Sequence, residues 1–489
     1  MTFNITTKNL DTFKSAFIAA LLAYIFVYGF ELTHFTLSID EEPLDNFLQT
    51  LSAGRWGHAL LRHYVLPEPY APFFTTALSI IILSLSAATS SIYIGLNKLQ
   101  SISFVIMLAA LPQLAYQLEF SNQADTVSLS FLLSVVALFM IEKMSVIRAS
   151  AFIMLTVVSL SVYQSIFLYA ATLTCIRITT DAIKGQIIFR QALKKIFVFS
   201  LLITLSLIIN SFLAKWTALY FDVTISNYLT SMIGWGKRDV YEVLKSVLIF
   251  MRDYLTFKSA YGINAFPFVL LSLITIIILS IKRKRGAPLI ILMGFATLLS
   301  GFLLNFAIGS GMPPRAMTQI PLVFAGLFAA ALVISRVRYI GLIISIIFLC
   351  IGSAASNKLF YSDFMAREAD QNLSNQIITT IYNNIPNFDE KVTPVFFYGS
   401  YSPLNSWKIP SADVFGSSFF DWDGGNNRRM YMYLSTANLI KLKEPNEIQV
   451  KNSIVAAKDM PSWPNRNSIK IFDGVVVVKL SDKLSPYNR

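Results

Sequence analysis

Charged residues are scarce in this chain of 489 residues. They make up 14% of it, whereas soluble globular proteins carry about 25%. This scarcity excludes an ordinary soluble domain. Apolar residues are correspondingly abundant and account for 55% of the chain. The 39 Phe and 21 Tyr suit a lipid-facing surface with aromatic belts at its two interfaces.

Cysteine is nearly absent as well. Cys175 and Cys350 both lie in apolar runs, which excludes a disulfide framework and a zinc-ligand spacing and is typical of small buried hydrophobes. Convincing internal repeats are lacking too. The net charge of +12 does not indicate nucleic-acid binding, because the basic residues form short clusters between apolar runs rather than one basic face.

Long apolar runs determine the predicted fold. A transmembrane helix needs about 20 mostly apolar residues. The first run follows Lys8 and Lys14 without a small-residue cleavage site, so it is predicted to be an uncleaved span. Eleven spans are predicted, near residues 14–32, 71–96, 101–118, 126–141, 149–161, 163–176, 196–214, 263–281, 287–307, 316–335 and 339–355.

The stretch Ala149–Ile176 leaves three alternatives open: two short spans, one long span, or a re-entrant pair hinged at Tyr163-Gln164. With a cytoplasmic N-terminus and eleven spans, the short outer turns after spans three, five and nine hold only Arg315. This distribution follows the positive-inside rule and favours eleven spans. The cytoplasmic loops then hold Lys98, Lys143, Arg148, Arg177, Lys184, Arg190, Lys194, Lys195, Lys282, Arg283, Lys284, Arg285, Arg336 and Arg338.

Two domains are predicted. Residues 1–355 form a mainly α transmembrane catalytic domain with outer loops 33–70 and 215–262, of which the second is amphipathic and expected to lie along the membrane interface. Residues 356–489 form a small periplasmic α/β domain. Its predicted elements are helices at Asp363–Ile385 and Asn427–Ile440 and strands at Pro394–Tyr398 and Ile469–Leu480.

The first outer loop carries the main candidates for chemistry, Asp40, Glu41 and Glu42 in a row. Membrane insertion does not require acids there. The loop also holds Gly54-Arg55-Trp56-Gly57, which sets a cation beside an aromatic ring, and all three histidines, His34, His58 and His63. The histidine spacings match no standard ligand pattern, so a divalent metal stays open as a cofactor without being indicated. A solvated loop near the headgroups is the plainer alternative.

A second acidic patch is predicted at the same membrane face. Glu119 and Asp125 lie in the turn between spans three and four, where they either cap helices or frame a site for a polar substrate. We add Trp56 of the first loop and the hinge residues Tyr163 and Gln164 as candidate substrate contacts.

Cations on the outer side are candidates for binding phosphate. Arg315 ends the turn Gly309–Arg315, whose Gly and Pro residues fix the backbone, and it opposes the positive-inside bias. A guanidinium there suits bidentate phosphate binding; the alternative is an anchor that extends to the headgroups. Further candidates are Arg55, Lys237 and Arg238.

The tail segment Asp413–Arg429 is dense in aromatic, acidic and amide side chains and glycine, as sugar-binding surfaces are and as surface loops also are. Asp421-Trp422-Asp423 could also be a metal–nucleotide motif, but nucleotide sugars are not supplied outside the cell. The candidates for substrate contact are Asp421, Trp422, Asp423, Asn426 and Arg428.

Taken together, these motifs resemble the bacterial and phage serotype-converting O-antigen glucosyltransferases of the glucosyl transferase II type. The resemblance rests on Ser38–Glu42, Gly54–Gly57, the Arg315 turn, Phe415–Phe420 and Met460–Pro464. The family is similar to the GT-C class, in which an acid of the first outer loop is the usual base. Among the three adjacent acids we favour Asp40, the one nearest the span end, with Glu41 second and Glu42 third. The resemblance implies an inner-membrane enzyme with undecaprenyl-phosphate glucose as donor and the O-antigen of lipopolysaccharide as acceptor.

The chemistry agrees with this resemblance. A sugar on a phosphate already has a good leaving group, so one carboxylate can suffice as general base, and direct attack by the acceptor inverts the anomeric centre. A cation is needed for the departing phosphate. The alternatives are a transporter or flippase for a lipid-linked sugar and a non-catalytic polymer-binding protein. Transporters favour repeats and mid-membrane ionisable groups, whereas the acids here gather at the outer boundary.

Overall fold

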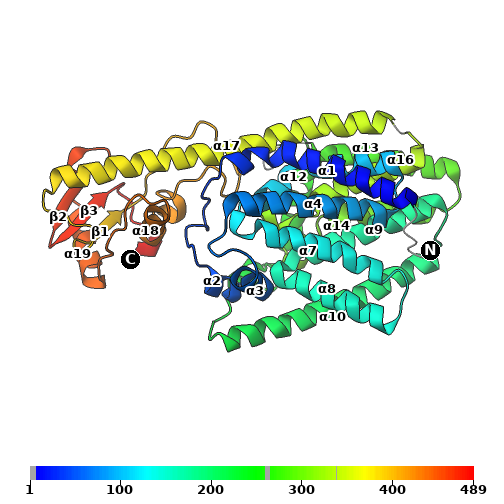
Figure 1. Ribbon diagram of the computed structural model, residues 1–489, viewed down its shortest axis with the longest axis horizontal. Coiled ribbons are helices and arrows are strands. Elements are labelled where there is room, and N and C mark those ends of the chain that lie inside the picture. Colours follow the sequence, from blue (N-terminus) through cyan, green and yellow to red (C-terminus); the bar gives the residue numbers. More distant parts are fainter. Residues whose placement is uncertain (1–6, 259–264, 338, 489) are drawn as a thin grey trace. The chain divides into compact units, whose positions relative to one another are not determined.

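The computed structural model describes residues 7–258, 265–337 and 339–488, which form two compact units (Figure 1). The first unit comprises Met1–Thr33 and Asp45–Asn357, and the second comprises His34–Leu44 and Lys358–Arg489. The short loop with the three adjacent acids is therefore grouped with the tail rather than with the residues on either side of it. Arg338 and residues 259–264, where an outer loop was predicted to end and the eighth span to begin, lie outside the described residues.

The first unit is helical. Seven described helices are long and apolar enough to cross a membrane, one bent pair could form an eighth span, and three more apolar helices are shorter. The long ones are α1 (Thr7–Thr33), α4 (Pro72–Ile94), α7 (Ser121–Met140), α9 (Phe167–Lys184), α10 (Phe189–Tyr220), α13 (Val269–Arg283) and α17 (Tyr339–Asn384). The bent pair joins α5 (Lys98–Ala109) to η1 (Pro112–Leu114) and α6 (Ala115–Leu118), and the shorter helices are α8 (Val146–Val162), α14 (Ala287–Ser300) and α16 (Ile320–Ser335).

The mainly helical, multi-pass prediction is confirmed, and each of the eleven predicted spans overlaps one of these apolar elements. The ambiguity at Ala149–Ile176 is resolved in part. Helix α8 ends before Tyr163, whose backbone is extended (φ −150°, ψ 112°), and a 3₁₀ turn, η2 (Gln164–Ile166), leads into α9. One long uninterrupted span is therefore excluded, and the break falls at the predicted hinge.

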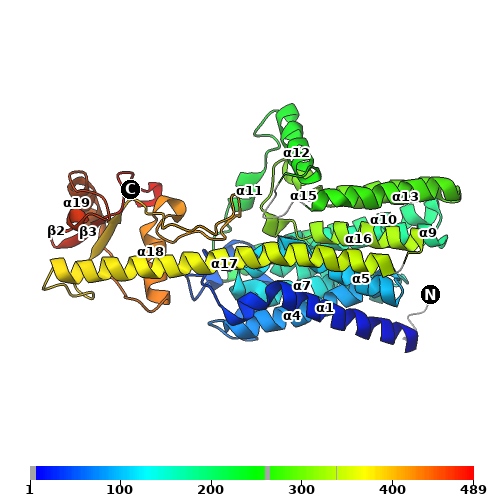
Figure 2. The same cartoon turned by 90° about the horizontal axis from the view of Figure 1, so that it is seen from above.

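Helix α4 shows how the sequence forms this bundle. Pro72 stands at its start, where no backbone N–H is needed, and Gly95 ends it in the left-handed conformation (φ 76°). Helices α1, α4 and α7 lie side by side in both views (Figures 1 and 2). Small side chains allow this close packing, as is common between helices in membranes. Those buried on α4 include Thr75, Thr76, Ser79, Ser84, Ser86, Ala87, Ala88, Ser90 and Ser91.

Short helices fill the connections of the first unit. They are α2 (Phe47–Ser52), α3 (Trp56–Tyr64), α11 (Tyr228–Met232), α12 (Val240–Leu255), α15 (Leu303–Ile308), η3 (Phe266–Phe268) and η4 (Pro314–Ala316). The amphipathic character predicted for 215–262 is found in α12, which buries Val243, Val247 and Met251 on one face and exposes Tyr241 and Leu248. In Figure 2, α12 crosses the direction of α13 and α16.

The second unit holds a three-stranded sheet in the order β1-β3-β2. Strand β1 (Val395–Tyr398) is parallel to β3 (Val475–Lys479), and β2 (Ile469–Phe472) is antiparallel to β3. The prediction of a single strand over Ile469–Leu480 is wrong. Asp473 and Gly474 both adopt positive φ (48° and 73°), as a two-residue hairpin turn requires, and they fold the run back on itself.

Helices complete the second unit. The predicted helix Asp363–Ile385 exists, but as the continuation of α17 rather than as a separate element. The predicted second helix is confirmed as α18 (Asn427–Thr436), and α19 (Glu447–Ala457) was not predicted. Short 3₁₀ turns are η5 (Trp422–Gly424), η6 (Arg466–Ser468) and η7 (Pro486–Asn488). The core of the sheet is made of Phe396, Tyr398, Ala457, Met460, Val475 and Val477.

Candidate active site

The three adjacent acids occupy one tight turn in the second unit. The backbone N–H of Glu41 donates to the carbonyl of Ser38 (3.0 Å), and the Ser38 N–H donates back to Oε2 of Glu41 (3.0 Å). Asp40 sits inside this turn with φ of 78°. Glycine or asparagine normally fills such a position, and strained residues of this kind cluster at functional sites.

The three side chains differ sharply in exposure. Asp40 is 40% exposed, Glu41 is fully buried at 0%, and Glu42 is 3% exposed. Glu42 also accepts a hydrogen bond through Oε2 from the Asp40 N–H (2.7 Å). Glu41 and Glu42 therefore both hold the turn in shape, and Asp40 is the acid that the solvent reaches most readily.

Arg429 of α18 binds two of these acids and a third from the tail. Its Nη2 donates to Oδ1 of Asp40 (2.8 Å), its Nη1 donates to Oε1 of Glu42, and its Nε donates to Oδ2 of Asp423 (2.7 Å). Three carboxylates thus share one guanidinium, whose planar fork suits several acceptors at once. We call Asp40, Glu42, Asp423 and Arg429 the acid–arginine cluster.

Sequence reasoning did not select Arg429, although it selected its neighbour Arg428. The helical period does not separate the two, because Tyr431, three residues after Arg428, and Tyr433, four residues after Arg429, are both buried. The packing of α18 decides it: Arg428 is exposed, whereas Arg429 is half-buried.

Burial raises the pKa of Glu42, which the charge of Arg429 only partly offsets. Ionised Glu42 therefore costs the fold stability. This loss of stability is absent when the pH is below the pKa of an unfolded glutamate, about 4.3. It reaches its full size when the pH is above the raised pKa of Glu42 in the folded protein.

A pH-dependent stability effect is expected from this shift. The melting temperature of Glu42→Gln minus that of the parent protein should become more positive as the pH rises from about 4.3. The amide removes the pH-dependent cost of ionising Glu42, and the net size of that cost already includes the attraction of Arg429. Thermal unfolding of both proteins across the pH range measures this difference, and a difference that does not vary with pH would contradict the assignment.

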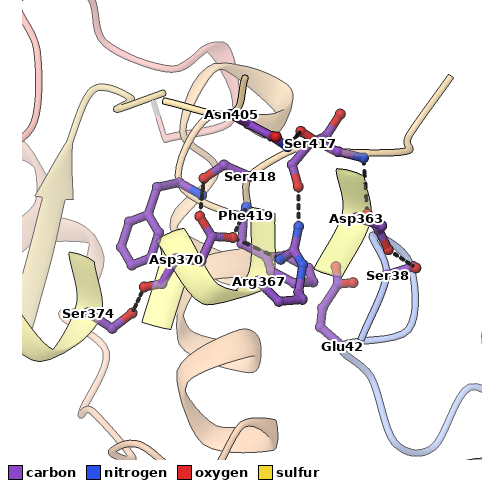
Figure 3. Close-up of polar contacts among 12 residues, drawn as sticks. Ser38, Glu42, Asp363, Arg367, Asp370, Ser374, Asn405, Ser417, Ser418 and Phe419 are labelled. Atoms are coloured by element: carbon purple, nitrogen blue, oxygen red, sulfur yellow. Dashed lines mark hydrogen bonds and ion pairs between the residues drawn. The ribbon is translucent and has the colours of Figure 1, made fainter. Parts of the chain in front are cut away.

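Asp363 of α17 holds the turn through Ser38 (Figure 3). Its Oδ2 accepts from the Ser38 hydroxyl (2.6 Å), and its Oδ1 accepts from the backbone N–H of Gly416 (3.1 Å). A second carboxylate on α17, Asp370, accepts from the N–H of Phe419 (2.9 Å) and from the Ser418 hydroxyl. The tail signature Phe415–Phe420 is therefore a segment that binds carboxylates of α17.

Arg367 completes this buried network. Its Nη1 pairs with Asp370 (2.8 Å), its Nη2 donates to the carbonyl of Ser417, and its guanidinium lies 4.3 Å from the ring centre of Phe419. Sequence reasoning missed Asp363, Arg367 and Asp370, because polar residues spaced along a helix read equally well as a solvated face.

The other tail candidates have varied positions. Asp423 belongs to the acid–arginine cluster, and Asn426 caps α18 by accepting from the N–H of Arg428 (3.1 Å). Asp421 and Trp422 are half-buried beside Asp423, in and next to η5. The structure thus links one of the five predicted tail residues, Asp423, to the loop acids through Arg429.

In the first unit, four segments distant in sequence meet around Tyr163. The guanidinium of Arg55 lies 4.8 Å from the Tyr163 ring centre, and the Tyr163 hydroxyl donates to the carbonyl of Arg315 (3.3 Å). The Arg315 guanidinium lies 5.2 Å from the ring centre of Phe120. Gln164 donates to the carbonyls of Ala53 (3.2 Å) and Gly54 (3.3 Å). The predicted cations Arg55 and Arg315 are therefore brought close to the predicted hinge.

The acids of the second patch are deeply buried. Asp125 forms an ion pair with Arg62 (2.5 Å), and Glu119 is 1% exposed. Trp56 donates through Nε1 to Asn210 (3.1 Å) and lines an apolar pocket of about 240 Å³ with Trp216, Tyr220 and others. The close packing of this loop needs Gly57, since a Cβ there would lie 1.8 Å from the Ser161 hydroxyl oxygen.

The remaining candidate cations support the backbone. Arg238 donates through Nη2 to the carbonyl of Gly309 (2.7 Å), where the Arg315 turn begins. Lys237 donates to the carbonyls of Thr230 (2.6 Å) and Ser231 (3.1 Å). Both side chains thus have structural partners, as does Arg55, which donates through Nη1 to Oε1 of Gln123 (3.0 Å).

The histidines show no arrangement typical of a metal site. His58 is buried, and its Nδ1 lies 2.8 Å from the Thr126 hydroxyl. Burial, with the charges of Arg62 and Arg55, lowers the pKa of His58 to about 3, so its ring is neutral at physiological pH. Among the described residues there is no group of three or more His, Cys, Asp or Glu side chains suited to a metal ion.

A bundle of apolar helices is the architecture of a multi-pass membrane protein. An accessible carboxylate beside buried ones is a group that can act as a base on a hydroxyl group. Residues 29–334 match the family model of glucosyl transferase GtrII, so the chain belongs to this family and is a glucosyltransferase, and membership implies a role in O-antigen modification. The resemblance inferred from the sequence is confirmed. No curated protein and no solved structure gives a match. The matched range includes the loop acids and Arg315 but ends before Arg429.

Proposed function

We propose that this protein transfers glucose from undecaprenyl-phosphate glucose to a hydroxyl group of the lipopolysaccharide O-antigen, on the periplasmic side of the bacterial inner membrane. The observation that carries the proposal is the acid–arginine cluster. It presents one accessible carboxylate, Asp40, in a turn fixed by Glu41, Glu42 and Arg429.

Asp40 is the proposed general base. Arg429 engages its Oδ1, and within the described part of the chain no hydrogen bond to its Oδ2 is found, so that oxygen can accept the proton of the acceptor hydroxyl. As Asp40 takes the proton, the hydroxyl oxygen of the acceptor attacks the anomeric carbon of glucose. The bond between that carbon and the phosphate oxygen breaks, and the configuration at the carbon inverts. We place Glu42 second, ahead of Glu41 and so in the reverse of their order along the chain, since its raised pKa suits a proton acceptor but its burial limits access. Glu41 is the third, because it is fully buried.

Arg315 and Arg55 are the proposed ligands of the leaving phosphate. Each guanidinium lies beside an aromatic ring, Arg55 beside Tyr163 and Arg315 beside Phe120, and Arg55 also donates to Oε1 of Gln123 (3.0 Å). Trp56, Tyr163 and Gln164 are the proposed carbohydrate contacts of the first unit. The tail residues Asp421, Trp422, Asp423, Asn426 and Arg428 are proposed separately as carbohydrate contacts of the second unit. A divalent metal is not needed for this chemistry, because guanidinium groups can balance the phosphate charge.

Replacing Arg315 should weaken use of the donor. Loss of a charge-assisted hydrogen bond typically costs about 1.5–3 kcal/mol, so Arg315→Ala should reduce kcat/KM for polyprenyl-phosphate glucose at least ~tenfold. Arg315→Lys should rescue this only in part, because the bidentate fork is lost. Lys237→Ala, which removes an outer cation that is bonded to the backbone, is the matched control. Unchanged donor kinetics in Arg315→Ala would leave Arg315 as an interfacial anchor and transfer the phosphate role to Arg55.

The proposed topology has eleven spans, a cytoplasmic N-terminus and a periplasmic tail. Periplasmic reporters fused after residue 356 should be active, whereas fusions within residues 178–195 should behave as cytoplasmic, because the basic residues of that segment resist translocation. Paired phosphatase and fluorescent-protein fusions at each point provide the measurement. A cytoplasmic tail would refute both this topology and the use of a periplasmic acceptor.

A further inference from the structure

A polar pocket of about 400 Å³ lies in the first unit, away from every residue discussed as a site so far. It forms where α4 ends, α5 begins, and α9 and α16 both end. Its lining residues are Gly95, Asn97, Gln100, Lys184, Val333 and Arg336. Two of these described residues are cations, two are carboxamides and none is acidic.

Both carboxamides use their oxygens within the protein. The Asn97 Oδ1 accepts from the N–H of Gln100 (3.0 Å), and the Gln100 Oε1 accepts from the N–H of Asn97 (3.2 Å). This reciprocal capping box uses both amide oxygens and leaves both NH₂ groups as donors. The start of α5 also carries the partial positive charge of a helix N-terminus.

The two cations have unequal roles. Lys184 donates to the carbonyl of Gly95 and so caps α4, which occupies one of its three N–H bonds. Arg336 ends α16 in the left-handed conformation and is exposed, and within the described part of the chain its guanidinium makes no hydrogen bond or ion pair. Gly95 permits the approach, since a Cβ there would lie 3.2 Å from the Lys184 Nζ.

The nearest acid does not neutralise the pocket. Asp181 pairs with Arg177 (2.9 Å) and lies 3.8 Å from Lys195, so its charge is already balanced from other sides. The pocket therefore combines two cations, two amide donors and a helix N-terminus without a compensating acceptor. This combination selects a compact anion with several oxygens, such as a phosphate.

We propose that this pocket binds the phosphate of an anionic lipid headgroup. The lipid is favoured over a soluble phosphate because α17 begins three residues after Arg336 with exposed apolar side chains, Tyr339, Ile340 and Ile343, which suit an acyl chain. By the positive-inside rule this end of the bundle faces the cytoplasm, where juxtamembrane cations attract anionic lipids. The site is independent of the proposed glucosyl transfer.

The test measures lipid binding to the full-length protein in an uncharged detergent by native mass spectrometry and by thermal shift. Phosphatidylglycerol should bind and raise the melting temperature, and phosphatidylcholine should not. Arg336→Gln should weaken phosphatidylglycerol binding at least ~tenfold, the usual effect of losing a charge-assisted bond. Arg336 is the preferred variant because, unlike Lys184, it caps no other helix. Lys282→Gln, an exposed cation of the predicted cytoplasmic loops with the same change of charge, should bind like the parent.

Inorganic phosphate and glycerol phosphate distinguish the source of the anion. If glycerol phosphate at millimolar concentration displaced the lipid from the parent protein but not from Arg336→Gln, that result would keep the phosphate site but assign it to a soluble ligand. Equal binding of phosphatidylcholine would overturn the proposal. So would equal losses in Arg336→Gln and Lys282→Gln, because binding would then follow overall surface charge.

Discussion

Asp40→Asn should lower the rate of glucosyl transfer by about two to four powers of ten, which is the usual share of general base catalysis. The amide keeps the size of the side chain and can still accept a hydrogen bond from Arg429, but it cannot take the acceptor's proton. The effect should fall on kcat, since binding of the donor does not need this group. Transfer measured with polyprenyl-phosphate glucose on correctly inserted protein provides the number.

The neighbouring acids supply matched comparisons for that result. Glu42→Gln tests the second candidate base, and Glu41→Gln tests a fully buried acid that holds the Ser38 turn. If Asp40→Asn kept normal turnover while Glu42→Gln lost it, Glu42 would be the base. Normal turnover in all three variants would refute the assignment of the base to this turn.

Arg429→Gln should destabilise the second unit and reduce activity together. Removal of one partner of a buried ion pair costs about 3–5 kcal/mol. Because the Arg429 side chain is 20% exposed, we expect the lower end, about 3 kcal/mol. The freed turn would also misplace Asp40, and displacements of about 1 Å cost roughly a hundredfold in rate. Thermal unfolding and transfer kinetics measure the two effects.

Two further variants separate position from charge. Lys451→Gln, an exposed cation of α19 with the same change of charge, should change neither stability nor rate appreciably. The double variant Arg429→Gln with Glu42→Gln should regain stability over Arg429→Gln alone, because the buried carboxylate is no longer left unpaired. Its activity should stay low, because Asp40 is still unsupported. If the double variant were no more stable than the single one, the ion pair would not be the source of the effect.

The acid–arginine cluster also explains why three acids stand in a row. Only Asp40 is accessible, while Glu41 and Glu42 accept hydrogen bonds from the backbone of their own turn. Glu41 and Glu42 thus stabilise the turn that exposes Asp40. These hydrogen bonds hold Asp40 in the left-handed conformation, which is strained for a residue other than glycine.

The sequence by itself determined the class of fold. Apolar runs of about 20 residues predict membrane helices because lipid leaves the backbone no other partner than itself. The same local reasoning predicted the helix break at Tyr163, and it predicted helix α18 and strand β1. It failed at Asp473-Gly474, where two residues with positive φ reverse a Val-rich run that looks continuous. It also failed to foresee that α17 continues from a span into the tail.

The tertiary structure alone decided which charged groups act together. Arg429 lies 387 residues after Glu42, and Asp363 lies 325 residues after Ser38, so no local spacing could relate them. A carboxylate selects its partner by distance and burial in space, and these depend on packing rather than on sequence separation. The sequence therefore identified the loop acids and favoured Asp40 by its place nearest the span end, whereas the fold showed Asp40 as the exposed member and Arg429 as its partner.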